Sequence, residues 1–429
     1  MQVLQGIISV IMTICSVWMT LMMVYQLYLT VFGFRKAKKD YADHDPQSRF
    51  LVLVPAHNEE NVISDIIRNL QQMDYPKELY DFYIIADNCT DNTAQAAADA
   101  GAKVIVTQAE SPDAPTGKPI ALKKALDYLG DYQNKYDLMM IFDADNLMDT
   151  NMFREVNSQF LDKDKPDFIQ CYLGCKNKGG LIAWFYYTSY VVVNHFTQLS
   201  KNRLNLNACI GGTGFAISTA YLHQRGGWST MSLTEDLEIQ VEATLAGKRL
   251  VWNHYTRVYD EKPTSALVSY RQKVRWNQGY TYVAIKNTRK IFSAFKQGKL
   301  PLKEFISMST YLYGMFTYLV VLVQTVCSII LHLPCFDYVF QPLTFWTALP
   351  SVVMFIYSYL FLFYWADWQD SHERFRWRTI PMILASLVVN IAISMASQVV
   401  GVARYKKQDT WVKTEHKLHA RAEESSLDA

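Results

Sequence analysis

The chain has 429 residues, of which 50% are hydrophobic, 14% aromatic and 19% charged, with a formal net charge of +2. Apolar residues gather toward both ends of the chain, while most of the carboxylates fall in the middle. This segregation excludes a basic nucleic-acid-binding protein and is typical of a membrane protein that carries one sizeable soluble domain.

The chain opens with an uncharged apolar run over residues 3–34 that is closed by Arg35, Lys36, Lys38 and Lys39. The run is too long for a signal peptide, lacks a basic start and has no small-residue cleavage site. It is long enough to span a bilayer, and the positive cluster places its C-terminal end inside. We therefore expect a transmembrane helix over residues 1–34, with the N-terminus outside and residues 35–300 in the cytosol. The seven scattered cysteines form no disulfide framework, which fits reduced thiols in that domain.

From Arg49 onward, short apolar runs alternate with helical segments. This βαβ alternation predicts a parallel, Rossmann-like sheet covered by helices, with the polar loops that follow its strands sharing one edge. Pro55 is expected to break the first strand, and Asn58 to start the first helix. The expected strands are 50–54, 82–86, 103–106 and one that reaches Asp143; the expected helices include 58–70 and 121–128.

Two carboxylates, Asp143 and Asp145, stand one residue apart directly after the apolar run 138–142. Converging carboxylates repel each other unless a hard cation or a hydrogen-bond network separates them, and Mg²⁺ and Mn²⁺ prefer such oxygen ligands. The alternative is a polar loop that caps the next helix. Taken alone, the pair favours the polar capping loop, because short motifs often occur by chance.

Further carboxylates follow the first two expected strands. Asn58 and Glu59 could cap a helix and complement its dipole. Asp87 and Asp91 could also be capping residues, or one of them could accept the imide N–H of a uracil, since an ionised aspartate only accepts hydrogen bonds.

Two motifs lie later in the chain. Ser232 and Glu235 fit a capping box and Asp236 complements the helix dipole, although a helix start can also hold a carboxylate rigidly as a general base. Arg275 and Trp276 could snorkel at a membrane surface; they are also suited to a diphosphate leaving group and to stacking under a sugar ring.

The remaining apolar segments could span the bilayer or lie at its surface. Residues 181–193 are too short to span, and their aromatic excess favours the bilayer surface over burial in the core; residues 264–296 could lie along the interface likewise. Residues 305–331, 343–364 and 381–402 are each long enough to span, within an expected membrane region 301–405. Three full crossings would place the tail, 406–429, outside despite Lys406 and Lys407. We therefore expect the last segment to be re-entrant or hairpin-like.

Together, these motifs resemble the membrane-integrated family 2 glycosyltransferases, which include cellulose, hyaluronan, chitin and poly-N-acetylglucosamine synthases. The resemblance covers roughly residues 50–280 and rests on five motifs in the family's order. They are Pro55-Ala56-His57-Asn58-Glu59, Asp87 to Asp91, Asp143-Ala144-Asp145, Thr234-Glu235-Asp236 and Gln272-x-x-Arg275-Trp276. A tail segment, Trp411 to His416, is similar to one found in some relatives, but an ordinary amphipathic surface segment explains it equally well.

The resemblance implies an α/β fold of the GT-A (Rossmann-like) type, flanked by transmembrane and interfacial helices. It implies that Asp87 contacts uracil, that Asp143 lies beside the nucleotide and that Asp145 binds Mg²⁺ or Mn²⁺. Asp236 would be the catalytic base, in a motif with Thr234 and Glu235. The remaining substrate-binding residues would be Ala56, Asn58, Glu59, Asp91, Lys118, Gly212, Thr213, Gln272, Arg275 and Trp276.

The implied activity is processive, inverting transfer from UDP-glucose or UDP-N-acetylglucosamine to a growing β-linked polysaccharide at the plasma membrane. The enzyme would be multi-pass, with its catalytic domain in the cytosol and the lipid bilayer around its helices. Accessory secretion or modifying subunits are expected partners, because the membrane region is small for enclosing a polymer channel alone. The alternatives are single addition of a sugar to a lipid, as in glucosylceramide-type synthases, and a non-catalytic scaffold, against which the intact carboxylate set argues.

Overall fold

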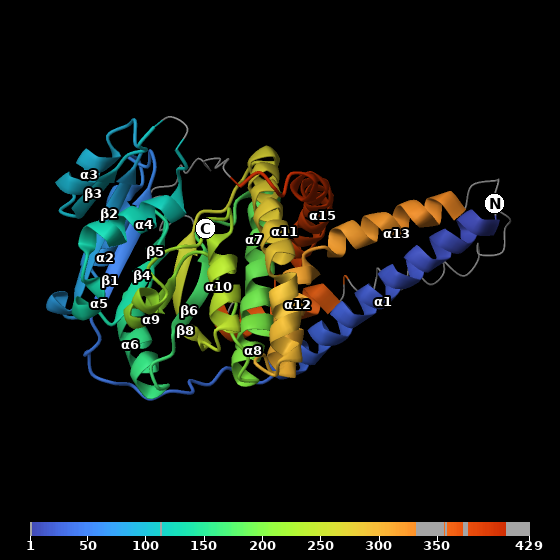
Figure 1. The fold of residues 1–429 in the computed structure, drawn as a ribbon, viewed down its shortest axis with the longest axis horizontal. Coiled ribbons are helices and arrows are strands. Elements are labelled where there is room, and N and C mark those ends of the chain that lie inside the picture. The colour runs from blue at the N-terminus through green and yellow to red at the C-terminus, as the bar shows by residue number, and fades with distance from the viewer. Residues whose placement is uncertain (1, 112–113, 332–355, 357, 372–375, 409–429) are drawn as a thin grey trace.

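The computed structural model describes residues 2–111, 114–331, 356, 358–371 and 376–408. A mixed α/β domain lies at one side, and a layer of long helices adjoins it (Figure 1). The strands are β1 (Phe50–Ala56), β2 (Tyr80–Asp87), β3 (Lys103–Thr107), β4 (Leu138–Ile141), β5 (Leu147–Met148), β6 (Phe168–Cys175), β7 (Phe215–Ser218) and β8 (Leu250–Asp260).

The described strands form one sheet in the order β3-β2-β1-β4-β7-β6-β8-β5. Strands β3, β2, β1 and β4 are parallel neighbours, as the sequence predicts. The expectation of a parallel sheet is only partly met in the other half: β7 runs antiparallel to both β4 and β6, and β5 antiparallel to β8, while β6 and β8 are parallel. The βαβ pattern could not reveal this half, because β7 has four residues and β5 only two.

Both faces of the parallel half are covered by helices, and β1 shows how. Phe50, Val52 and Val54 pack with α2 (Ile63–Gln71) and α6 (Met152–Asp162), while Leu51 and Leu53 pack on the opposite face. That second face is covered by α4 (Lys118–Leu129), α9 (Thr219–Gln224) and α10 (Glu235–Leu245). A strand buried on both faces reads as a continuous apolar run, as residues 50–54 do. Helix α3 (Thr93–Asp99) covers the sheet beside β3.

Two local expectations at the end of β1 are wrong. Pro55 does not break the strand, because β4 pairs with β1 only through Leu53 and one side of β1 needs no N–H donor beyond it. Asn58 does not start the helix either. It adopts a left-handed conformation, with φ of 55°, in a turn that ends at Val62, the residue that precedes α2.

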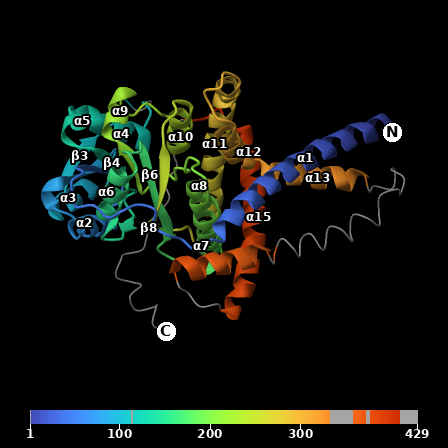
Figure 2. The ribbon, with the colours of Figure 1, turned by 90° about the horizontal axis from the view of Figure 1, so that it is seen from below.

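The helical layer is built from α7 (Gly180–Val193), the π-helix η2 (Asn194–Leu199), α8 (Ser200–Arg203), α11 (Ala266–Lys296), α12 (Leu302–Gly314) and α15 (Ile380–Ala403). Helices α1 (Gln2–Gly33) and α13 (Thr317–Leu331) extend away from the α/β domain (Figures 1 and 2). In the described part of the chain, Val3–Gly33 and Trp377–Ala403 are each long and apolar enough to cross a membrane. A bent pair, α12 with Thr317–Ile330 of α13, adds a third candidate with a 60° bend.

The last apolar segment is one continuous helix, so the expectation of a hairpin there is wrong. Pro381 lies in the first turn of α15, where its missing N–H is not needed. The hydroxyls of Ser386 and Ser397 bond to carbonyls of the same helix, at 2.7 and 3.0 Å, which satisfies them without a break. The bend lies instead between α12 and α13. Residues 343–355 of the middle segment and the Trp411 segment lie outside the described residues.

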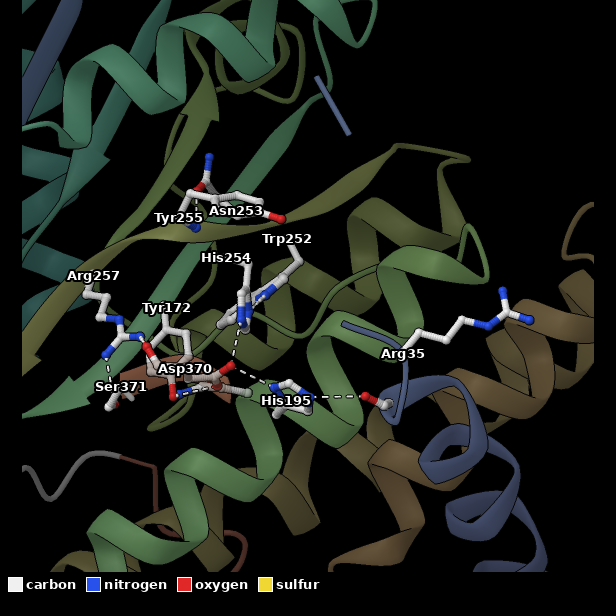
Figure 3. A network of polar contacts seen from close by, with 12 residues as sticks. Arg35, Tyr172, His195, Trp252, Asn253, His254, Tyr255, Arg257, Asp370 and Ser371 are labelled. Atoms are coloured by element: carbon white, nitrogen blue, oxygen red, sulfur yellow. Dashed lines mark hydrogen bonds and ion pairs between the residues drawn. The ribbon is translucent and has the colours of Figure 1, made fainter. Parts of the chain in front are cut away.

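A buried polar cluster joins α1, η2 and the helical residues 358–371 to the sheet (Figure 3). Asp370, from the helical residues 358–371, accepts from His195 Nδ1 of η2 at 2.7 Å and from His254 Nε2 of β8 at 3.0 Å, both on Oδ1. Tyr172 of β6 donates to its Oδ2 at 3.1 Å. His195 Nε2 bonds to the carbonyl of Gly33, the last residue of α1, at 3.0 Å. One carboxylate therefore links four elements that are far apart in the sequence.

The hydrogen-bond directions assign the protons in this cluster. Both ring nitrogens of His195 lie within hydrogen-bond distance of oxygens, Asp370 Oδ1 and the Gly33 carbonyl. Trp252 Nε1–H donates to His254 Nδ1 at 3.2 Å, so His254 is neutral and carries its proton on Nε2. Ligand-type atoms of the two histidines and Asp370 lie within 4.8 Å of one another, as at a metal site. However, that proton occupies the nitrogen that would face a metal, which favours a proton-bonded junction.

Asp370→Asn tests this junction. Burial alone would raise the pKa of Asp370, but His254 and His195 hold it well below its usual range. Breaking a buried ion pair by removing one partner costs about 3–5 kcal/mol, so we expect a clear fall in the thermal midpoint of purified protein. Asp162→Asn, in an exposed pair with His44 at 3.7 Å, is the control and should change little. A wild-type midpoint that falls on chelation would contradict the proton-bonded reading.

Candidate active site

The site is built at the carboxyl ends of β1, β2 and β4, and its centre is Asp143, directly after β4. The Asp143 backbone N–H donates to Asn146 Oδ1 at 3.0 Å and to Thr213 Oγ1 at 3.1 Å, which fixes the loop. Lys118, the first residue of α4, donates from Nζ to Asp143 Oδ1 and to the Gly212 carbonyl, both at 2.6 Å. Lys118 thus ties two other predicted site residues, from two separate loops, to one ammonium.

The charge of Lys118 is maintained by its carboxylate neighbours. Burial alone would lower the pKa of Lys118, but Asp143, Glu235 and Asp236 together raise it above its ordinary value. The ammonium therefore stays protonated at neutral pH and partly neutralises three carboxylates that would otherwise repel one another.

Glu235 and Asp236 occupy the first turn of α10, after Thr234 as the N-cap residue. Burial, and then the charge of Asp236, raise the pKa of Glu235 to about 7; burial also raises the pKa of Asp236. A carboxylate whose pKa is raised toward neutrality is a stronger base than an exposed one. The pair is therefore suited to proton transfer at neutral pH.

The predicted capping box at this helix is wrong. The side chain of Thr234 does not cap the helix, and the Ser232 backbone N–H donates to Glu238 Oε2 at 3.1 Å, not to Glu235. Close packing against α11 explains this. A Cβ placed on Gly279 of α11 would lie 2.5 Å from Thr234 Oγ1, so the helices touch where a cap would form.

The loop Gly211–Gly214 lies against Asp236. Gly212 adopts a φ of 79°, and a Cβ there would stand 3.1 Å from Asp236 Oδ2. The buried side chain of Gln170 in β6 holds the loop: it donates to the carbonyls of Thr213 and Gly214 at 3.0 and 3.2 Å, and accepts from the Gly211 N–H at 2.9 Å. Our sequence analysis missed Gln170. A glutamine inside the apolar run 168–173 was the available signal, because a buried amide needs partners.

The nucleotide-side residues lie where β1 and β2 end. Asp87 is buried; its Oδ1 accepts from Thr107 Oγ1 at 2.8 Å, and its carbonyl bonds to His57 Nδ1 at 2.7 Å. Asn58 accepts from the Thr90 N–H at 2.7 Å, which ties the loop after β1 to the loop after β2. The two loops therefore form one wall of the site.

Three other predicted residues have mainly structural contacts in this wall. Asp91 accepts from the Thr93 N–H at 3.0 Å and from the Glu60 N–H at 3.3 Å, in the manner of a capping residue. Glu59 is buried, and its N–H donates to Thr93 Oγ1 at 2.7 Å. Ala56 ends β1, where its carbonyl accepts from Cys89 Sγ at 3.5 Å. These hydrogen bonds hold the loops after β1 and β2 in place.

Helix α11 contributes the remaining motif. Gln272 accepts from the Tyr186 hydroxyl at 3.2 Å, and the Trp276 ring meets the Tyr186 ring edge-on, with centroids 6.3 Å apart. Arg275 makes no hydrogen bond or ion pair with the described residues. Its charge nevertheless partly offsets the burial that raises the pKa of Glu235 and of Asp236. The charge of the guanidinium therefore acts on Glu235 and Asp236.

A carboxylate that the sequence analysis missed completes the acidic group. Asp145 is buried and accepts from the Glu261 N–H at 2.8 Å, which places it beside Asp260 at the end of β8. Burial, together with Asp145 and Asp143, raises the pKa of Asp260 to about 6, although Lys262 opposes the rise. Asp260 Oδ2 bonds to Lys262 at 2.6 Å, while its Oδ1 is buried with no hydrogen-bond partner among the described residues. These oxygens fit the donor set of Mg²⁺ or Mn²⁺.

The fold and the carboxylates at its strand ends define the class of protein: it has the GT-A fold of glycosyltransferases. A mannosyltransferase from Pyrobaculum calidifontis, solved with GDP-Man and Mn²⁺, superposes with a TM-score of 0.60 at 16% identity, over 90% of this chain and 99% of that one. Residues 46–279 match the family described as Glycosyltransferase like family 2, and the chain belongs to that family.

Curated relatives are similar over part of their length. A probable glycosyltransferase, YdaM, of Bacillus subtilis is 24% identical over 63% of this chain and 66% of its own. A beta-monoglucosyldiacylglycerol synthase of Nostoc is 26% identical, and the match covers 53% of this chain and 48% of that protein. A poly-beta-1,6-N-acetyl-D-glucosamine synthase of Staphylococcus aureus is 23% identical, and the match covers 62% of each chain. The matches thus span about half to two thirds of these relatives.

The coupled carboxylates predict an unusual pH profile. If Asp236 must be deprotonated to act, its raised pKa means that the transfer rate begins to fall at a higher pH than it would with an ordinary carboxylate as base. Glu235→Gln removes a like charge, so the acid limb of the kcat profile should move to lower pH. Glu242→Gln, farther along α10, is the control and should leave the limb in place. An unmoved limb in Glu235→Gln would contradict the coupling.

Proposed function

We propose that the protein is a membrane-embedded, inverting glycosyltransferase that moves a hexose from a UDP-sugar to the end of a growing β-linked polysaccharide. UDP-glucose and UDP-N-acetylglucosamine are the leading donors. The observation that carries the proposal is the convergence of the Asp236 carboxylate, the Gly212 loop and the Lys118 ammonium, with the charge of Arg275 acting on the same carboxylate.

The proposed donor site divides between two walls. The wall after β1 and β2 would hold uridine, with the carboxylate of Asp87 accepting the imide N–H. Lys118 and Arg275 would face the diphosphate; a guanidinium can bind two of its oxygens at once.

We propose the following organisation of the chain along its length. An N-terminal span over 1–34 would precede a cytosolic catalytic domain over 35–300, a membrane region over 301–405 and a cytosolic tail over 406–429.

The oxygens of Asp145 and Asp260, with Asp143 beside them, would hold Mg²⁺ or Mn²⁺. The buried, unpartnered Oδ1 of Asp260 supports this assignment, because such an oxygen otherwise costs free energy. When bound, the ion would supply positive charge to the diphosphate oxygens as they become a leaving group.

The chemistry proposed for the chain's own residues is direct displacement. Asp236 takes the proton from an acceptor hydroxyl, the hydroxyl oxygen attacks the anomeric carbon, and the bond from that carbon to UDP breaks with inversion. A positioned base of this kind contributes about 10²–10⁴-fold to a rate. Lys118 and Arg275 stabilise the negative charge that develops on the departing diphosphate.

Polar packing around α11 favours a sugar chain as acceptor. Lys273 donates to Ser394 Oγ of α15 at 3.0 Å, and Asn277 donates to Ser397 Oγ at 3.3 Å, on either side of Trp276 in the sequence. The neighbouring rings of Trp276 and Tyr186 offer aromatic surface of the kind on which sugars stack. A lipid acceptor would need an apolar path from the bilayer, whereas the helix contacts beside this motif are polar.

Single addition of a sugar to a membrane lipid is the second candidate. The observation in its favour is the 26% identity over 230 residues to beta-monoglucosyldiacylglycerol synthases, which equals or exceeds the identity to the polysaccharide synthases. Both candidates use the same donor site and the same base, so the product separates them.

The product test uses purified protein in vesicles with radiolabelled UDP-glucose or UDP-N-acetylglucosamine, with and without diacylglycerol. We expect a ladder or a high polymer on a gel, formed without added lipid. Asp145→Asn, which alters a proposed metal ligand, is the control and should give neither product. A single lipid-sized spot that requires diacylglycerol would overturn the polysaccharide assignment in favour of the lipid enzyme.

A further inference from the structure

The chain that follows α15 returns to the catalytic loop. Gln408, five residues beyond the end of α15, accepts through Oε1 from the backbone N–H of Leu233 at 3.0 Å. Leu233 directly precedes Thr234, Glu235 and Asp236, and it is buried. A buried backbone N–H without a partner costs free energy, so this bond restricts where the loop can lie.

A second glutamine holds Gln408 in place. Gln278 of α11 is buried, and its side chain donates to the carbonyls of Arg404 and Lys407, both at 3.3 Å. In return, Gln408 Nε2 donates to the Tyr405 carbonyl at 2.6 Å and lies 3.4 Å from the carbonyl of Gln278. The two amides therefore connect the end of α15 to α11 and, through Leu233, to the start of α10.

Backbone packing on both sides of α11 leaves little room for movement. On one side, a Cβ at Gly279 would lie 2.8 Å from the Thr234 backbone nitrogen. On the other, a Cβ at Gly401 of α15 would lie 2.4 Å from Asn277 Cβ. Helix α11 is thus held between α15 and the Thr234-Glu235-Asp236 turn, and a shift of α15 would be passed to that turn.

We propose that Gln408 is a positioning residue for the transfer reaction: through Leu233 it fixes the first turn of α10, so that Asp236 stays against the Gly212 loop. The inference rests on the proposed function in one respect, the role of Asp236 as base. It implies that the end of the C-terminal membrane helix is part of the catalytic frame, and that the geometry of the base depends on where α15 ends. Gln408 does not touch the donor site, so donor binding does not depend on it.

The kinetic test compares three variants of the full chain. Gln408→Ala removes the acceptor for Leu233 N–H; a catalytic group displaced by about 1 Å can cost about 10²-fold, so we expect kcat to fall at least about tenfold. UDP affinity should stay within about twofold. Gln408→Glu keeps an acceptor but no donor, and should recover part of the loss. Gln297→Ala, at the exposed end of α11, is the control and should match the wild type.

A second readout does not depend on turnover. Amide hydrogen exchange in a peptide spanning residues 229–238 should be faster in Gln408→Ala than in the wild type, and unchanged in Gln297→Ala. If the wild type transfers no sugar from any UDP-sugar, the proposed function fails, while the exchange result still tests the contact. Wild-type exchange in Gln408→Ala, an unchanged kcat, or an equal loss of kcat and UDP affinity would each overturn the positioning role.

Discussion

The site depends on one ammonium among three carboxylates. Asp143, Glu235 and Asp236 come from two stretches of chain about 90 residues apart, and without a cation between them their repulsion would open the site. Lys118 meets this constraint by ion pairing with Asp143 and by bonding to the Gly212 carbonyl, next to Asp236. The same charge limits how far burial raises the pKa of Glu235 and Asp236. The charge of Lys118 therefore both holds the carboxylates of the site together and limits how far their pKa values rise.

The helical layer gives this arrangement its rigidity. Helix α11 presents Arg275 and Trp276 to the site, and its Gly279 lies against Thr234 at the start of α10. On its other face it packs along α15, one of the described helices that could cross a membrane. The His195–Asp370 junction performs a similar task at the far end, where it binds the last carbonyl of α1. The geometry of the site therefore depends on this helical layer.

The sequence predicted those parts of the site that follow from local pattern. Apolar runs that end in carboxylates placed Asp87, Asp143 and Asp145 at strand ends, and the family resemblance supplied the GT-A fold, which the structure confirms. The antiparallel pairings of β7 and β5 were missed, because these two strands are short and their pairing is set by neighbours far along the chain. The capping box failed for a similar reason: Gly279, more than forty residues away, decides what Thr234 can do. Local sequence could not identify three further residues, because their roles depend on contacts with residues far along the chain. They are Gln170, Asp260 and Gln408.

The most direct test of the account is Asp236→Asn, with UDP affinity and sugar-transfer rate measured on the same purified protein. The amide keeps the shape of the side chain but cannot accept a proton from the acceptor hydroxyl. We predict that the transfer rate falls by at least about 10²-fold, the lower end of the contribution of a general base, while UDP affinity stays within a few-fold. Transfer within a few-fold of the wild-type rate would contradict the account, because Asp236 would then only complement the dipole of α10.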